Sequence, residues 1–272
     1  MKQKIKKSFS LDALPSYKKP PVNEVVCGMR FNPLDKLYIP HVGLLWNKFR
    51  REYPNIQHAP PIASSKGELL IDQASGIPLH RIWFINESDD QLIQFQFDRF
   101  YFNWRRRKND YPRYDHVISN FIKVLHSITD LFKEFGLGEI KPIEYELSYI
   151  NHIPKGEGWN TIDDLPKIFT DFLWKQQEKR FLPNPENVFW KAEFPLPETK
   201  GYLVVDLKKA IRTEDKVPLF VLEMKARGNG KATSEKDMLE WFSIAHEWIV
   251  RGFTDLTTPE IQAIWEREKC LK

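Results

Sequence analysis

The chain has 272 residues, of which 42% are hydrophobic, and this length suffices for one large domain or two smaller ones with a buried core. Its 41 basic and 37 acidic side chains leave a net charge of only +4, so a nucleic-acid-binding role would depend on a local basic patch. Two cysteines do not indicate a disulfide framework or a thiolate metal site, and no apolar run reaches the roughly 18 residues that a membrane span needs. We therefore expect a cytoplasmic protein that does not contact a membrane.

The first half of the chain predicts a basic arm, a strand, a helix, three strands and a long helix. Lysines are frequent in residues 1–19, which we expect to form a flexible arm. The predicted elements are a strand at 23–31, a helix at 35–54, strands at 68–73, 80–86 and 92–104, and a helix at 117–135. Gly136 and Gly138 are expected to end the long helix. Its apolar stripe consists of Val117, Phe121, Val124, Leu125, Ile128, Leu131, Phe132 and Phe135.

The second half of the chain repeats this order of elements. They are a strand at 143–151, a helix at 161–179, strands at 187–194, 201–211 and 218–228, and a helix at 234–257. Thr161, with Asp164 three residues later, is a candidate N-cap. A nearly constant number of residues separates corresponding elements, which indicates an internal duplication. The predicted repeats are 20–138 and 139–258, followed by a short helix or tail at 259–272.

The order of elements predicts an α+β fold. Two β-α-β-β-β-α units would form a mainly antiparallel, curved sheet, because joining the units edge to edge removes two exposed sheet edges. The amphipathic helices would cover one face of this sheet, in a saddle-like arrangement. The other face would then be the natural binding surface.

Several stretches of the chain resemble a sporadically distributed bacterial family of unknown function. They are KKPPVNEVVCGMRF at 18–31, QFQFDRFYFNW at 94–104 with YPRYDHVISNF at 111–121, and AHEWIVRGFTDLTTPEIQAIW at 245–265. The family has a Pro-Pro and Glu-Val start, an Arg-Phe and Asn-Trp element before a long helix, and an ending with His, Phe, Leu-Thr and Trp. The resemblance implies a cytosolic bacterial protein of about this length. It implies no activity, catalytic residue or cofactor.

Residues 92–108 combine a run of aromatic side chains with four consecutive cations. The apolar positions are odd-numbered up to Phe97 and even-numbered from Phe100, which predicts a bulge near Asp98 and Arg99 within one strand. If both are buried, these two charged side chains need partners, and we treat them as a structural polar pair. The following cations are Arg105, Arg106, Arg107 and Lys108. They are expected to form a solvated connection to the next helix, or alternatively a nucleic-acid-binding patch with the rings as a stacking platform.

Asp206, Glu223 and Lys225 match the bare pattern of metal-dependent nucleases. Such enzymes place an acidic residue on one strand and Glu-x-Lys on the next, so that two carboxylates bind Mg²⁺ beside a lysine. The helix predicted before these strands carries a further acidic residue, Glu178. The same pattern also arises as a cross-strand ion pair on a solvated hairpin.

No other pattern in the sequence indicates chemistry. The histidines form neither HxH nor HExxH, and His246 lies on the apolar side of its helix, as expected of a core histidine. We therefore predict no resident metal and no cofactor. The first functional hypothesis is a non-enzymatic binding or adaptor module, regulatory or antitoxin-like, with a protein partner. The alternatives are a Mg²⁺-dependent nuclease using Asp206, Glu223 and Lys225, and nucleic-acid binding through Arg105–Lys108.

Overall fold

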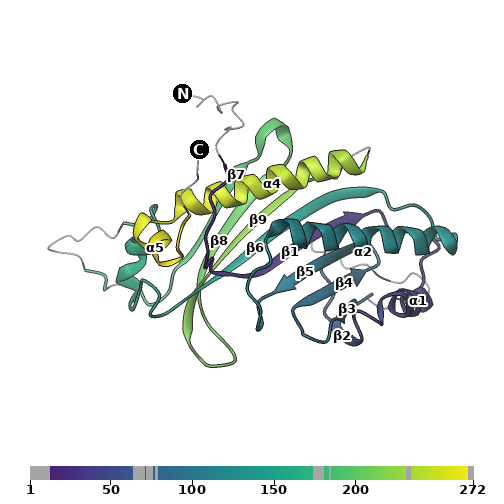
Figure 1. Cartoon of the computed structure of the whole chain (residues 1–272), viewed down its shortest axis with the longest axis horizontal. Helices are drawn as coiled ribbons and strands as arrows, with labels where there is room; N and C mark the ends of the chain where they lie inside the picture. Colours follow the sequence, from purple (N-terminus) through teal and green to yellow (C-terminus); the bar gives the residue numbers. More distant parts are fainter. Residues whose placement is uncertain are drawn as a thin grey trace. The chain divides into compact units, whose positions relative to one another are not determined.

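The computed structural model describes residues 13–63, 71, 76, 79–173, 181–183, 185–230 and 234–268 (Figure 1). These residues form an α+β fold with a nine-stranded antiparallel sheet and five α-helices. The strands are β1 (Val22–Phe31), β2 (Asn55–Ala59), β3 (Arg81–Ile85), β4 (Gln91–Gln96), β5 (Arg99–Arg105), β6 (Pro142–Pro154), β7 (Phe189–Pro195), β8 (Tyr202–Ile211) and β9 (Pro218–Asn229). The helices are α1 (Ile39–Phe49), α2 (Tyr114–Glu134), α3 (Leu165–Ile168), α4 (Glu235–Leu256) and α5 (Pro259–Ile264). No helix within these described residues is long and apolar enough to cross a membrane.

Hydrogen bonds join the strands in the order β2-β3-β4-β5-β1-β6-β9-β8-β7. The chain divides into two compact units that do not coincide with continuous segments. Unit 1 comprises residues 1–23, 149–227 and 240–272, and unit 2 comprises residues 24–148 and 228–239. We describe each unit by itself.

In unit 2, α2 packs on one face of the sheet because its apolar stripe meets the rings of β4 and β5 (Figure 1). Phe121 stacks on Phe100 with ring centroids 5.3 Å apart, and both side chains are fully buried. Phe49 of α1 reaches the same face and lies 6.3 Å from Phe84. Gly136 ends the helix with a positive φ of 63°, as the sequence predicts.

The predicted single strand at 92–104 is wrong, because the structure has a tight hairpin there. β4 ends at Gln96, β5 begins at Arg99, and these two residues are directly paired. The two-residue loop of Phe97 and Asp98 reverses the chain, so Phe95 and Phe100 lie opposite each other on the same face. The apolar positions therefore change from odd to even residue numbers because the chain reverses in a hairpin, and not because one strand contains a bulge.

Two further differences concern local elements of the chain. β2 is an additional strand, which lies between the predicted helix at 35–54 and the predicted strand at 68–73. The predicted strand at 68–73 falls almost entirely outside the described residues. Residues 161–173 of the predicted helix at 161–179 contain only a 3₁₀ turn (Ile162–Asp164) and α3, because Phe169 is extended and forms a β-bridge with Thr257. Residues 174–179 lie outside the described residues.

In unit 1, β7, β8 and β9 form an antiparallel meander whose side chains alternate between buried and exposed positions. α4 packs closely on it at Gly252, where an added Cβ would lie 3.2 Å from Met224 and 3.4 Å from Leu203. Tyr17 is buried against Phe253, with ring centroids 5.6 Å apart. Residues 1–12 of the predicted arm lie outside the described residues.

Candidate functional site

The unit 2 sheet has two different faces. The face that packs against α2 carries aromatic rings, and the opposite face carries polar side chains. Alternation along the paired strands places these side chains on one face. We call this set the polar face; it consists of Glu24, Asn55, Gln57, Arg81, Trp83, Gln94, Gln96, Arg99, Tyr101, Asn103 and Arg105. No helix among the described residues of unit 2 packs on it. Several of its amide and guanidinium groups are nevertheless buried, so their hydrogen bonds matter for stability.

A chain of hydrogen bonds runs across four strands of the polar face, β3, β4, β5 and β1, from a cation to a carboxylate. Arg81 Nη1 donates to Gln94 Oε1 at 2.6 Å, and Gln94 Nε2 donates to Asn103 Oδ1 at 2.7 Å. Asn103 Nδ2 then donates to Glu24 Oε1 at 2.5 Å. The side-chain amides of Gln94 and Asn103 each accept a hydrogen bond from the direction of Arg81 and donate one in the direction of Glu24. The dipoles of the two amides are therefore aligned along this chain of hydrogen bonds.

Trp83 lies beside two guanidinium groups on the polar face. The Arg81 Cζ atom is 5.3 Å from the centroid of the Trp83 ring, and the Arg105 Cζ atom is 6.0 Å from it. Both distances are within the range of a cation–π interaction. Burial lowers the pKa of Arg81 and of Arg105, although an arginine keeps its charge at any physiological pH.

Three buried N–H groups at this place have no hydrogen-bond partner among the described residues: Arg81 Nε, Trp83 Nε1 and Arg105 Nε. An unsatisfied buried donor is rare in a folded protein and costs roughly 1–3 kcal/mol. All three donors belong to side chains that surround one indole ring. The surrounding side chains close all three nitrogen atoms off from solvent.

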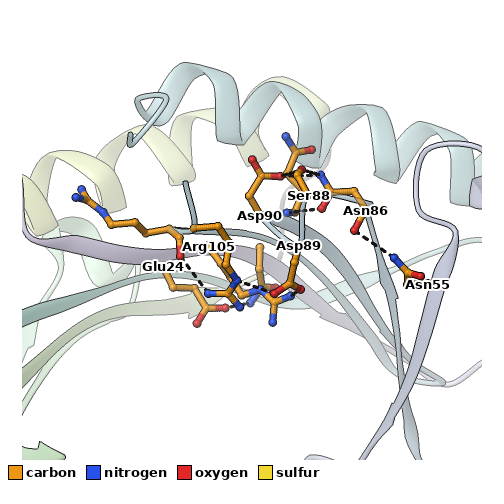
Figure 2. Close-up of polar contacts among 11 residues, drawn as sticks. Glu24, Asn55, Asn86, Ser88, Asp89, Asp90 and Arg105 are labelled. Carbon is orange, nitrogen blue, oxygen red and sulfur yellow. Dashed lines mark hydrogen bonds and ion pairs between the residues drawn. The ribbon is translucent and has the colours of Figure 1, made fainter. Parts of the chain in front are cut away.

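The turn between β3 and β4 supplies carboxylates next to this place (Figure 2). Asp89, with a positive φ of 59°, forms ion pairs with Arg105 and with Arg107, the latter at 2.6 Å. Asp90 accepts hydrogen bonds from Asn86 at 2.7 Å and Ser88 at 2.6 Å. Burial acts to raise the pKa of the Asp90 carboxyl, but these hydrogen bonds outweigh it and the net pKa is lowered.

The predicted basic run lies at and beyond the end of β5. Arg105 and Arg107 are paired with Asp89, whereas Lys108 is exposed. The preceding rings Phe100, Phe102 and Trp104 are buried on the helix-facing side, so they are core side chains and not a surface for stacking bases. The structure therefore separates the rings from the cations that the sequence places side by side.

Asp98 and Arg99 form a largely buried ion pair in the hairpin loop. Arg99 Nη2 lies 2.7 Å from Asp98 Oδ2, and Arg99 Nε donates to Asp98 Oδ1 at 2.9 Å. Burial acts to lower the pKa of Arg99, and the hydrogen bonds with Asp98 reverse this effect and raise it. Gln96 also donates to Asp98, at 3.1 Å, which links the pair to the polar face.

Asp206, Glu223 and Lys225 lie on one face of the unit 1 meander. Asp206 is directly paired with Glu223 across β8 and β9, and Lys225 Nζ forms an ion pair with Glu223 Oε1 at 2.7 Å. Within the described part of the chain, no group of three or more histidine, cysteine or acidic side chains could hold a metal ion. Glu178, the further acidic residue, lies outside the described residues.

Two surface grooves lie away from all of these residues. One groove in unit 2, of about 450 Å³, is lined in part by Met29, His126 and Tyr145. Another in unit 1, of about 430 Å³, is lined in part by Leu203 and Trp248. None of the site residues predicted from the sequence lines either groove.

His246 is stacked on Tyr149 with ring centroids 6.0 Å apart, and burial lowers its pKa to about 4. It is therefore neutral near pH 7, and its side chain is partly buried.

The sequence analysis did not single out Arg81, Trp83, Gln94, Asn103 or Glu24 as site residues. A signal was present, because Arg81 and Trp83 alternate with the core residues Ile82 and Phe84. A cationic and an aromatic side chain on the polar side of a strand indicate that this side has a specific role. Only the pairing of β3, β4, β5 and β1 brings the five residues together.

Comparisons with protein-family models, with curated proteins and with solved structures found no match. The family resemblance described above therefore stays a prediction.

Proposed function

We propose that this protein is a non-enzymatic binding module, with an adaptor or regulatory role, and that it contacts its partner through the polar face of unit 2. The polar face carries this proposal, because it presents the cations Arg81 and Arg105 beside Trp83 and no helix among the described residues of unit 2 packs on it. We propose that the partner is a protein and that both proteins act in the cytoplasm.

The test is capture of partners by the purified full-length protein, compared with two variants. Arg81→Gln removes a charge from the polar face. Arg50→Gln is the matched control, because Arg50 lies 5.9 Å from the ring of Trp46 in a similar arrangement elsewhere in unit 2. Partners retained by the wild type and by Arg50→Gln but lost with Arg81→Gln support the proposal. Retention that does not depend on Arg81 contradicts it.

We also propose that the chain arose by internal duplication. The support is that the order β1-α1-β2-β3-β4-β5-α2 recurs as β6-α3-β7-β8-β9-α4, without a counterpart of β2, and that β1 is adjacent to β5 and β6 to β9 in the sheet. Superposing residues 22–136 on residues 142–257 tests it. An alignment that does not preserve this order would contradict both the duplication and the saddle-like arrangement expected from it.

A second candidate function is Mg²⁺-dependent nucleic-acid cleavage at Asp206, Glu223 and Lys225. One observation favours it: directly paired residues on antiparallel strands have Cα atoms about 4.5–5.5 Å apart, so the two carboxylates can approach a shared cation. Cleavage that requires Mg²⁺ and is lost in Asp206→Asn and Glu223→Gln, but not in the exposed control Glu193→Gln, would establish it. Equal background cleavage by all four proteins would exclude it.

A further inference from the structure

β7 in unit 1 is an edge strand, because β8 is its only neighbour among the strands of the described residues. None of its seven residues is buried, and the ring of Phe189 is 79% exposed. The backbone N–H and C=O groups on the side away from β8 can pair with a further strand, which is the usual way in which an exposed sheet edge binds another chain.

The side chains of β7 divide between two faces. Trp190 and Phe194 lie on the face that α4 covers, because the β8 residues with which they pair are buried core side chains. Lys191 and Glu193 lie on the opposite face, and both are exposed. Neither of these two charged residues makes an ion pair or a hydrogen bond with a described residue. Each is therefore available to a charge on a neighbouring strand.

The sequence of β7 is complementary to itself when two copies pair antiparallel about Ala192. Lys191 of each copy then lies directly opposite Glu193 of the other, and Trp190 of each copy lies opposite Phe194 of the other. Opposite charges and aromatic rings are both favourable as directly opposed cross-strand pairs. A lysine on an edge strand otherwise discourages pairing, so the acidic residue opposite it makes this register specific.

This register also uses the whole strand. β7 runs from Phe189 to Pro195, so a pairing centred on its middle residue overlaps all seven positions of both copies. Pro195, which has no N–H group to donate, falls at the end of the overlap, where a missing donor costs the ladder least.

The apolar side of this pairing continues the core of unit 1. Trp190 lies against Phe172, with ring centroids 5.6 Å apart. Phe194 lines the groove of about 430 Å³ together with Leu203 and Trp248. Because Trp190 of a second copy would lie opposite Phe194, its ring would reach the edge of this groove and cover apolar surface there.

We propose that the protein forms a symmetric dimer in which the β7 strands of two copies pair antiparallel, centred on Ala192. The partner at this surface is thus a second copy of this chain. The same patch is used on both copies, so the assembly closes at two chains and does not extend into a filament. The β7 surface lies in unit 1 and is separate from the polar face of unit 2.

A charge exchange tests the register. Analytical ultracentrifugation of the full-length protein over a concentration series should find a monomer–dimer equilibrium. Lys191→Glu and Glu193→Lys should each weaken dimerisation by about tenfold or more, because two opposed charge pairs become two like-charge pairs. The double variant Lys191→Glu/Glu193→Lys restores both opposed pairs and should dimerise like the wild type. Lys208→Glu is the matched control, since Lys208 is exposed on the inner strand β8, and it should leave dimerisation unchanged.

A cross-link tests the centre of the pairing. Directly opposed residues of an antiparallel pair have Cα atoms about 4.5–5.5 Å apart, which a disulfide can span. In a Cys270→Ser background, mild oxidation should join two chains of Ala192→Cys into a covalent dimer, whereas Lys208→Cys should stay monomeric in a denaturing gel. Cys27 is buried and should not react.

Several results would overturn the proposal. They are a wild type that stays monomeric at every concentration, dimerisation that neither single charge change weakens, and a double variant that does not recover. Assemblies larger than two chains would contradict the closed symmetry. Circular dichroism of each variant checks that a loss of dimerisation is not a loss of fold, and the double variant decides the register even if one single variant is unfolded.

Discussion

Gln94 donates a hydrogen bond of 2.7 Å to Asn103 on the neighbouring strand, and both side chains are less than a tenth exposed. The two amides connect Arg81 to Glu24, which lie on strands that are not adjacent in the sheet. The link holds Arg81 beside Trp83 through the neutral amide of Gln94.

Replacing Gln94 by Leu should lower the free energy of unfolding by about 1–3 kcal/mol, because it leaves buried hydrogen-bonding groups of Arg81 and Asn103 unsatisfied. Urea denaturation measures this change. Gln57→Leu is the control on the same face, since Gln57 is exposed and should change stability by less than about 0.5 kcal/mol. Equal effects of the two substitutions would show that the amide chain contributes nothing.

Gly28 on β1 allows the ring of Tyr101 on β5 to lie against the backbone, since an added Cβ would overlap the ring. Gly28→Ala should therefore destabilise the protein by about 1–3 kcal/mol through overpacking. Gly43→Ala in α1, where an added Cβ meets no atom within 4 Å, should instead stabilise it by roughly 0.5–1 kcal/mol. In thermal denaturation, the double variant Gly28→Ala/Tyr101→Ala should be more stable than the sum of the single effects predicts.

Phe100→Ala should cost roughly 3–5 kcal/mol of unfolding free energy, because it empties a fully buried site that stacks on Phe121. Phe135, at the end of the predicted apolar stripe of α2, is 46% exposed and provides the comparison. Phe135→Ala should cost less than about 1 kcal/mol. Guanidinium denaturation of both variants distinguishes a core ring from a surface ring.

Changing Arg106 and Arg107 to Gln together should alter stability by less than about 1 kcal/mol, because the Arg107–Asp89 ion pair is partly exposed. We expect only weak binding to oligonucleotides, with little dependence on these two residues. A salt titration with single- and double-stranded oligonucleotides measures it. Micromolar or tighter binding, with a salt slope that falls by about 1–2 units in the variant, would favour the nucleic-acid alternative.

Asp164 should give a pH-dependent contribution to stability. The hydrogen bond from Lys167, together with the backbone N–H groups of Asn160 and Thr161, lowers the pKa of the Asp164 carboxyl to about 2. Because the folded pKa lies below the unfolded one, this stability is present above about pH 4 and is lost as the pH falls toward 2. Urea denaturation should therefore find Asp164→Asn less stable than the wild type near pH 6, with a difference that shrinks in acid. A difference that is constant with pH would contradict the assignment.

The sequence by itself determined features that depend on neighbours along the chain. The stripe of α2 from Val117 to Phe132 follows from side chains that recur every turn, and the stop at Gly136 follows from its freedom to adopt a positive φ. Burial of Phe95, Phe97, Phe100 and Phe102 likewise follows from hydrophobicity alone. The pairing of Thr161 with Asp164 at a helix start is also a local relationship.

Only the tertiary structure decided which side chains meet across strands. Alternation places Arg81 and Trp83 on the polar side of β3, but the partners of these side chains depend on the register of β4, β5 and β1. The same holds for the hairpin at Phe97 and Asp98, since a change of parity is compatible with a bulge and with a two-residue turn. Strand register is set by the packing of whole faces and by the turns between strands, so the residues around Trp83 meet only when the sheet is assembled.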